Sequence, residues 1–347
     1  MNLYFSQTSP RSSGTQLGVA GPPSAGRQWR SVSLACTLAC LWGGLVVAAA
    51  DSGLALAESD SRAIQWTLDY AGKTIMVYSF DPQKFKPYVK ALNTLDGYGV
   101  LRDSPSDHLH HHAMMYGITV NGINFWEETP GCGVEKVIES PRPVIEQTVD
   151  GRPQARVTQL LYWVAPQDAF LPNSNSPPLL IERRTLVLTV DPGNRETALH
   201  WQSSFEVGTK SNVVTLSGAN YHGLGMRFLK ERDPVAKHLT PQGKLELSNN
   251  RQDVSPHPWE SVLFDTPANP ATIALFGAAT NAHADDHYFA MRSPFAYLSA
   301  TQNLDREPLV YHQGEHFELN FLITLYPELK TTEALAERSR QWRSLGR

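Results

Sequence analysis

Cysteine and basic charge are scarce in this 347-residue sequence. The three cysteines are too few for a disulfide framework, and two of them, Cys36 and Cys40, lie in a segment that we expect to be removed, which leaves Cys132 unpaired. The formal net charge is −4, so the chain offers no basic stripe for nucleic acid or for an anionic membrane surface. A small neutral or weakly charged ligand fits this composition better.

Several common catalytic motifs are absent as well. The chain has no G-x-S-x-G elbow, no P-loop, no G-x-G-x-x-G fingerprint at the head of a βαβ unit and no H-E-x-x-H helix. These absences exclude the common serine hydrolases, NTPases, dinucleotide enzymes and zincin proteases. They leave open a lyase, an epimerase or a carbohydrate-binding protein.

An apolar run near the N-terminus has the pattern of a secretory signal peptide. Arg27 and Arg30 precede the run Val32–Ala50, and Ala55–Ala57 supplies an A-x-A cleavage site. Because the run is about as long as a bilayer span, an uncleaved anchor helix is the alternative. Either interpretation exports the rest of the chain.

This pattern divides the chain into three segments. We expect residues 1–26, rich in serine, glycine and proline, to be a disordered leader or the result of a start codon placed too early. Residues 27–57 form the predicted signal peptide, with cleavage after Ala57, and residues 58–347 form a single periplasmic or secreted domain. No apolar run after Ala57 is long enough to span a membrane, so we expect no membrane contact after cleavage.

Alternation of apolar and polar residues dominates the chain from Ile64 onward and predicts short β-strands. The segment Glu182–Val190 ends at the turn residues Asp191–Asn194, and a new strand starts at Arg195, which is typical of a hairpin. The spacing of such turns predicts roughly fifteen or more strands. The alternation is clearest in residues 74–80, 156–164, 179–190 and 317–326.

Only the last stretch, Thr331–Leu345, has helical periodicity, because Leu335, Ala336, Ser339 and Trp342 fall on one face. No stretch alternates strands with regular helices and no internal repeat stands out, which argues against a Rossmann fold, a βα barrel and a propeller. The sequence therefore predicts an all-β protein, a large antiparallel sandwich with a C-terminal helix.

Histidines are concentrated in one short segment. Asp107–His112 contains four of the 12 histidines of the chain. On an extended strand, His108, His110 and His112 would share one face. Neutral imidazole binds zinc, copper, iron or nickel, and it also moves protons near neutral pH.

Strand geometry limits what this segment does alone. Same-face neighbours on a strand lie about 6.5 to 7 Å apart, so a metal site would need a ligand from elsewhere in the chain. The candidates for that ligand are His222, Glu127, His312 and His316. Two metal-free interpretations stay open, an acid/base or sugar-binding cluster and a polar turn introduced by Ser104–Asp107. The residues that we assign to a divalent metal, if one is bound, are His108, His110 and His222.

A second polar group surrounds Gly223 and Gly225. Tyr221 and His222 precede these glycines, and His222 would be a second proton carrier. Arg227 would provide a cation for a carboxylate, a phosphate or a developing oxyanion. The alternative is that the glycines mark a bulge and that Arg227 pairs with a structural acid.

A third group lies in Asn124–Glu128, where aromatic rings adjoin carboxylates. Trp126 would cover the apolar face of a sugar while Glu127 binds its hydroxyls, although the aromatic residues of this group fit a protein core at least as well. The last group is His312–His316, where the glycine favours a hairpin turn, although His312 could still face a pocket.

These motifs resemble a family of exported bacterial proteins known as the PmoA or methane oxygenase PmoA-like family. The D-H-x-H-H segment followed by N-G-x-x-F-W is the specific part, and the resemblance covers nearly the whole mature chain. One departure is that His112 and Ala113 stand where the family often carries Arg or His and then Gly. The matching motifs are Lys86–Tyr88, Gly99–Pro105, Asp107–His112, Val120–Trp126, Gly223–Arg227 and Gly314–Glu315.

The resemblance implies a fold related to the β-supersandwich of galactose mutarotases. In mutarotases, a histidine acid and a glutamate base act on a sugar ring. By resemblance, His110, His111 or His222 would be the acid, and Glu127 or Glu315 would be the base. The family name implies a copper or iron oxygenase, which the absence of membrane spans after the leader does not support.

We therefore predict an exported carbohydrate-active protein that acts on a sugar or an oxidised sugar by proton transfer, as an epimerase, mutarotase or lyase. A non-catalytic glycan-binding module is the alternative. The expected partner is a small carbohydrate. The predicted catalytic residues are His110, His111, His222, Glu127 and Arg227. The predicted substrate-binding residues are Asp107, Trp126, Tyr221 and His312.

Overall fold

The computed structural model contains a mostly β domain that belongs to one compact unit of residues 49–347. The predicted leader and signal peptide lie outside the described residues, except for Gly53–Leu56. Leu54–Leu56, which cleavage after Ala57 would remove, form an edge strand in the structure. The structure describes residues 53–56, 64–169, 171–247, 252–282 and 286–345.

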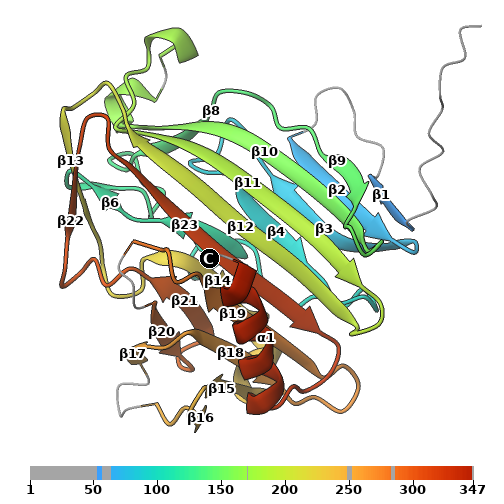
Figure 1. Cartoon of the computed structure of the whole chain (residues 1–347). Helices are drawn as coiled ribbons and strands as arrows, with labels where there is room; N and C mark the ends of the chain where they lie inside the picture. Colours follow the sequence, from blue (N-terminus) through green and yellow to red (C-terminus); the bar gives the residue numbers. More distant parts are fainter. Residues whose placement is uncertain (1–52, 57–63, 170, 248–251, 283–285, 346–347) are drawn as a thin grey trace, which may run out of the picture. The chain divides into compact units, whose positions relative to one another are not determined.

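A nine-stranded antiparallel sheet forms one layer of the domain (Figure 1). Both early and late parts of the chain contribute strands to it, so residues far apart in the sequence become neighbours. Its strands, in order across the sheet, are β1 (Leu54–Leu56), β2 (Gln65–Tyr70), β3 (Lys73–Ser79), β4 (Tyr88–Leu92), β5 (Met114–Gly117), β14 (Gly223–Arg227), β21 (Tyr297–Thr301), β20 (His287–Met291) and β17 (Gln252–Pro256).

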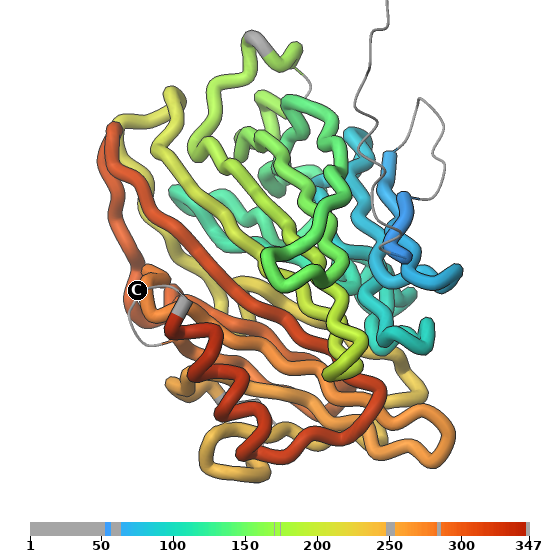
Figure 2. The backbone as a smooth tube through the Cα atoms, turned by 45° about the vertical axis from the view of Figure 1, so that its right-hand side comes forward, coloured from blue at the N-terminus to red at the C-terminus, as the bar shows by residue number. Residues whose placement is uncertain are grey.

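A ten-stranded antiparallel sheet forms the second layer. Its central strands are long, and Figure 2 shows them running beside one another across the domain. In order, its strands are β16 (Gly243–Lys244), β15 (Ala236–Thr240), β18 (Trp259–Phe264), β19 (Ala271–Gly277), β23 (His316–Tyr326), β12 (Glu196–Val207), β11 (Leu180–Asp191), β10 (Pro153–Val164) and β8 (Val134–Val137), with β9 (Val144–Gln147) also paired to β10.

Smaller elements complete the domain. A four-stranded sheet contains β22 (Leu309–His312), β13 (Val213–Ser217), β6 (Thr119–Val120) and β7 (Ile123–Asn124). The helices are three short 3₁₀ helices, η1 (Pro166–Asp168), η2 (Asn173–Asn175) and η3 (Lys230–Val235), and one α-helix, α1 (Thr332–Leu345). Within the described part of the chain, none of the helices combines the length and apolar character that a membrane span requires.

The two large sheets pack face to face, which confirms the predicted antiparallel sandwich. Met114 and Leu224 of the first sheet share one buried apolar cluster with Val157 and Trp201 of the second. The period-two alternation is the cause, because it turns every second side chain of a strand inward. The predicted hairpin is also confirmed, since β11 and β12 pair antiparallel up to their connecting turn.

A buried ion cluster lies within this apolar core. Arg184 donates to Glu182 (2.7 Å) and to Glu135 (2.8 Å), and all three side chains are inaccessible to solvent. Trp163 also donates to Glu182, at 2.8 Å. Arg184 further donates to the backbone carbonyl of Pro87 at 2.9 Å, just before β4. Because a buried charge is costly unless it is paired, this cluster fixes the second sheet against the start of β4.

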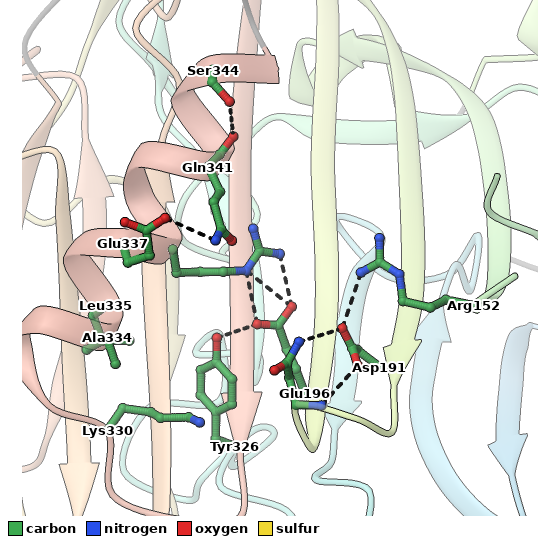
Figure 3. A pocket seen from close by; sticks show the side chains of 12 residues that line it. Arg152, Asp191, Glu196, Tyr326, Lys330, Ala334, Leu335, Glu337, Gln341 and Ser344 are labelled. Carbon is green, nitrogen blue, oxygen red and sulfur yellow. Dashed lines mark hydrogen bonds and ion pairs between the residues drawn. The ribbon is translucent and has the colours of Figure 1, made fainter. Parts of the chain in front are cut away.

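The predicted C-terminal helix is confirmed as α1, which packs on the outer face of the ten-stranded sheet through Leu335 and Trp342. Arg338 donates to both carboxylate oxygens of Glu196, at 2.9 and 3.0 Å, and Tyr326 donates to the same carboxylate (Figure 3). The cavity beside this pair is lined by charged residues that are largely paired with one another, and we regard it as part of the anchor of the helix.

Substituting Arg338 tests this anchor. We expect Arg338→Met to lower the free energy of unfolding by about 2 kcal/mol, because a buried carboxylate loses its charge-assisted hydrogen bonds. Arg340→Met is the matched control, since Arg340 pairs only with Glu337 on the exposed surface of the same helix and should change stability by less than about 0.5 kcal/mol. Urea titration followed by circular dichroism measures both. Equal effects of the two substitutions would disprove the anchoring role.

Candidate functional site

The candidate site lies on the outer face of the nine-stranded sheet, away from the sandwich core. Residues of β5, β20 and β21 that do not face the core form a second apolar cluster there. It includes Met115, Phe289 and Tyr297, together with Trp126 from the loop after β7. A second layer of side chains therefore covers this part of the sheet on the side where a sandwich normally meets solvent.

Gly225 makes room for this outer cluster. It lies in the middle of the sheet, paired with Met115 on one side and Ser299 on the other. A β-carbon at Gly225 would lie 1.9 Å from the Tyr297 hydroxyl and 2.7 Å from the Trp126 ring. Two aromatic rings of the chain itself therefore approach the backbone at Gly225, which only a residue without a side chain allows.

The histidine segment is not a strand. Ser104–His112, which we call the histidine loop, consists of successive turns, with backbone hydrogen bonds from His108 to Pro105 (2.9 Å) and from His111 to His108 (2.9 Å). The Ser104 amide closes the loop by donating to the His111 carbonyl at 3.0 Å. The predicted alternation of faces was therefore wrong, because the segment adopts the turns that Ser, Pro and Asp favour.

The turns bring three imidazoles together that a strand would have separated. The ring centroid of His111 lies 4.5 Å from that of His108 and 4.6 Å from that of His110, and the His108 and His110 centroids are 5.9 Å apart. These three rings form one side of a cavity of about 350 Å³. The complete lining is His108, His110, His111, Glu127, Tyr221, Phe289, Met291, Phe295 and Tyr297.

His112 points away from the cavity into a buried charged network. Its Nδ1 lies 2.9 Å from Asp103 and its Nε2 lies 2.8 Å from Glu128, while Tyr88 stacks on the ring at 3.8 Å. Lys86, only 1% exposed, completes the network by pairing with Glu128 at 3.2 Å. Since both imidazole nitrogens face carboxylates, both carry protons and the ring is a cation.

The pKa values in this network follow from its geometry. Burial opposes the charge of His112, but the hydrogen bonds to Asp103 and Glu128 outweigh it and raise the pKa above the ordinary value of 6.5. Burial likewise opposes ionisation of the two carboxylates, and their hydrogen bonds with His112 nevertheless lower both pKa values. His112 is therefore the member of the segment that holds the histidine loop in place.

The histidines at the cavity have the opposite electrostatics. Burial, reinforced by His110 and His108, lowers the pKa of His111 to about 3. Burial, followed by the charge of Lys86, also lowers the pKa of His110. Both imidazoles are therefore neutral at neutral pH, so each is a potential proton acceptor.

Arg227 does not line the cavity. Its side chain is 2% exposed, donates to Asp107 at 3.1 Å and lies 3.2 Å from the centroid of Phe295. The alternative that Arg227 pairs with an acid of the protein is therefore confirmed, and that acid is Asp107. The predicted oxyanion role gains no support, because Phe295 and not Arg227 borders the cavity.

Trp126 and His222 lie behind the cavity lining. Trp126 is fully buried, as the core alternative predicted, and stacks on His222 with 5.1 Å between ring centroids. Burial lowers the pKa of His222 to about 4, so this imidazole is neutral too. Tyr221 does line the cavity and contacts the edge of Trp126 at 5.7 Å. Of the residues outside the histidine loop that the sequence predicted for the site, Tyr221 and Glu127 line the cavity.

His312 lies elsewhere, at the end of β22, where it pairs with Val213 in the four-stranded sheet. Its amide donates to the carboxylate of Glu315 at 2.6 Å across a tight turn. The predicted turn is present, but it is not a hairpin turn, because β22 pairs with β13 while β23 pairs with β12 and β19. Neither His312 nor Glu315 is among the residues that line the cavity.

The predicted metal ligands do not fit a metal ion. His108 and His110 share the cavity, but His222 stacks on Trp126 behind it. Across the described ranges, no group of three or more His, Cys, Asp or Glu side chains is arranged to hold a metal. We therefore derive no step from a metal.

Most of the aromatic residues of the cavity, and the charged network, were not predicted from the sequence. Phe289, Phe295 and Tyr297 come from β20, β21 and the loop between them, and Lys86 precedes β4. One signal was available: β19, β20 and β21 are apolar at nearly every position, which indicates strands covered on both faces. The ion pairs of Lys86 and His112 had no such signal, because they join distant segments.

Comparison with known families identifies the chain. A model of a family of unknown function (DUF6807) matches residues 65–340, and the chain belongs to this family. The match does not extend to the PmoA-like family, so that resemblance stays a prediction. The comparison with curated proteins finds no match.

Several solved structures of sugar-processing enzymes resemble the fold distantly. The galactosidase domain of an α-galactosidase-sucrose kinase is 10% identical with a TM-score of 0.44, covering 79% of this chain and 42% of that one. An α-galactosidase from Geobacillus stearothermophilus is 8% identical with a TM-score of 0.41, covering 79% and 40%. A putative aldose 1-epimerase from Klebsiella pneumoniae is 10% identical with a TM-score of 0.28, covering 83% and 85%. The chain spans less than half of the two galactosidase structures, and likenesses this distant do not extend to activity.

The charged network predicts a specific pH dependence of stability. The raised pKa of His112 contributes stability that is complete below pH 6.5 and is lost as pH rises through the raised value. We expect His112→Gln to lower the free energy of unfolding by about 3 kcal/mol at pH 6 and by clearly less at pH 9, because it breaks a buried ion pair.

Denaturant titrations of both proteins at the two pH values measure this difference. His312→Gln is the control, since His312 is exposed and its amide, not its ring, makes the hydrogen bond to Glu315. If His112→Gln costs the same at both pH values, His112 is not a cation in the folded protein.

Proposed function

We propose that this chain is an exported carbohydrate-active protein whose cavity binds one sugar ring and moves a proton on it. The observation that carries the proposal is the composition of the cavity. The lining combines the rings of Tyr221, Phe289, Phe295 and Tyr297 with the three loop histidines and Glu127. Aromatic rings that cover C–H faces, together with polar groups that bind hydroxyls, are the usual way in which proteins hold sugars.

The loop histidines provide hydrogen-bonding groups for such a ligand. Nδ1 of His111 is buried and has no hydrogen-bond partner among the described residues, although His111 borders the cavity. A buried polar atom of this kind is costly unless a ligand or water satisfies it. A sugar hydroxyl or carbonyl oxygen would meet that requirement.

His110 is the best-placed base. It is neutral at neutral pH, and the negative charge of Glu127 acts on it in the direction that favours a proton. In the proposed step, His110 takes the proton from the carbon beside a carbonyl of an oxidised sugar, and the electron pair of the C–H bond moves to the carbonyl oxygen. Neutral His111 donates a hydrogen bond to that oxygen, and Glu127 stabilises the imidazolium that forms. Return of a proton from His110 restores the original sugar, whereas delivery of a proton by water to the opposite face, with His110 losing its own proton to solvent, gives the epimer.

Deuterium incorporation tests this step. We expect the protein to exchange a carbon-bound hydrogen of a keto sugar with solvent D₂O, and His110→Gln to slow the exchange at least about 100-fold, because the base is lost. The exchange rate should rise with pH and reach its plateau before pH 6.5. The reason is that the pKa of His110 is lowered from that value and that only neutral His110 accepts a proton.

NMR of a panel of keto sugars and aldoses in D₂O provides the measurement, and His312→Gln is the control. Binding without exchange in any sugar would favour a glycan-binding module over an enzyme, which the aromatic share of the cavity lining also permits. Absence of binding across the panel would remove the carbohydrate proposal altogether.

Export is a separate part of the proposal. It is supported by the apolar run Val32–Ala50 between two arginines and an A-x-A site. We expect the mature protein from a secreting host to begin at Glu58, which N-terminal sequencing of the periplasmic or secreted fraction would show. Retention of residues 1–57 on a membrane-bound product would indicate the anchor alternative.

A further inference from the structure

Some of the charged side chains near the cavity form ion pairs and others do not. Lys86 is buried and paired with Glu128, and Arg227 is buried and paired with Asp107. Both cations thus lie behind the cavity wall and have carboxylates of their own. Neither is among the residues that line the cavity.

Glu127 is different from the other acids of the site. Its carboxylate lines the cavity, and among the described residues no lysine, arginine or histidine forms an ion pair with it. Neighbouring Glu128 makes ion pairs to both Lys86 and His112. The two adjacent glutamates therefore differ in function. Glu128 belongs to the charged network behind the cavity lining, whereas Glu127 is available to bind a ligand in the cavity.

Two of the three histidines in the lining add no positive charge that would attract an anion. His110 and His111 have lowered pKa values and are neutral at neutral pH. The lining also contains the rings of Tyr221, Phe289 and Tyr297, whose centroids lie 6.1 and 6.0 Å apart in successive pairs, together with Phe295. Aromatic faces carry partial negative charge, so rings beside a carboxylate favour a cation over an anion.

From this charge distribution we infer that the cavity selects a sugar that bears an ammonium group, an amino sugar, over its neutral counterpart and rejects sugar acids. Glu127 accepts hydrogen bonds from the ammonium group, and the aromatic rings border the rest of the cation. A uronate would instead bring its carboxylate toward Glu127 in a confined space, where like charges repel strongly. This inference rests on the proposed carbohydrate function and names the substrate class of that same site.

Isothermal titration calorimetry with matched ligands tests the inference. The probes are D-glucose, D-glucosamine, N-acetyl-D-glucosamine and D-glucuronate, and the same four derivatives in the galacto series. We expect the amino sugar of the preferred series to bind about tenfold more tightly than its neutral and N-acetylated forms, and the uronate to bind most weakly. The N-acetylated form controls for the position of the substituent, because it keeps the nitrogen and removes its charge.

Substitution of Glu127 assigns the selectivity to one residue. In Glu127→Gln, the affinity ratio between amino sugar and neutral sugar should fall to about twofold or less, and the penalty of the uronate should shrink. Glu139→Gln is the matched control, because Glu139 is exposed and does not line the cavity. Its ratio should equal that of the wild-type protein.

The outcomes separate the inference from the function on which it rests. Uronate binding as tight as that of the amino sugar, or a preference that survives in Glu127→Gln, would overturn the inference while leaving the carbohydrate site in place. Absence of binding by all eight sugars and by the keto sugars of the exchange panel would overturn both. A preference for the amino sugar that disappears in Glu127→Gln and persists in Glu139→Gln would establish it.

Discussion

The candidate site depends on one buried interaction, the imidazolium of His112 between the carboxylates of Asp103 and Glu128. This interaction connects the histidine loop to the segment after β7, and Lys86 forms a second ion pair with Glu128. Paired charges of this kind are costly to break once they are buried, so they hold a loop in one geometry. The ion pairs of His112 thus fix the loop that positions His108, His110 and His111 at the cavity.

This network is continuous with the core of the sandwich. Arg184 donates to the carbonyl of Pro87, and the Glu135 amide donates to the carbonyl of Phe85, so both neighbours of Lys86 are held by the second sheet. Lys86 in turn donates to the Trp126 carbonyl at 2.9 Å, beside Glu127. A chain of hydrogen bonds thus runs from the buried ion cluster to the cavity wall, and a rigid scaffold positions a site that is made largely of loops.

The geometry also assigns the histidines to two classes. His110 and His111 face a cavity where burial keeps them neutral, whereas His112 faces two carboxylates that keep it charged. Adjacent residues in the chain therefore differ in protonation because turns direct them into different surroundings. The same division separates Glu127, which lines the cavity, from Glu128, which is paired behind it.

The sequence by itself determined the sandwich, the hairpin between β11 and β12 and the helix α1, because period-two alternation, turn residues and helical periodicity are local signals. It also located the histidine loop and Glu127. The tertiary structure alone decided which side chains meet. It placed His312 beside Val213 in the four-stranded sheet, Arg227 against Asp107, and the aromatic residues of β20 and β21 in one cavity with the histidines. Those contacts join segments that lie 99 residues or more apart in the chain, and no local pattern encodes them.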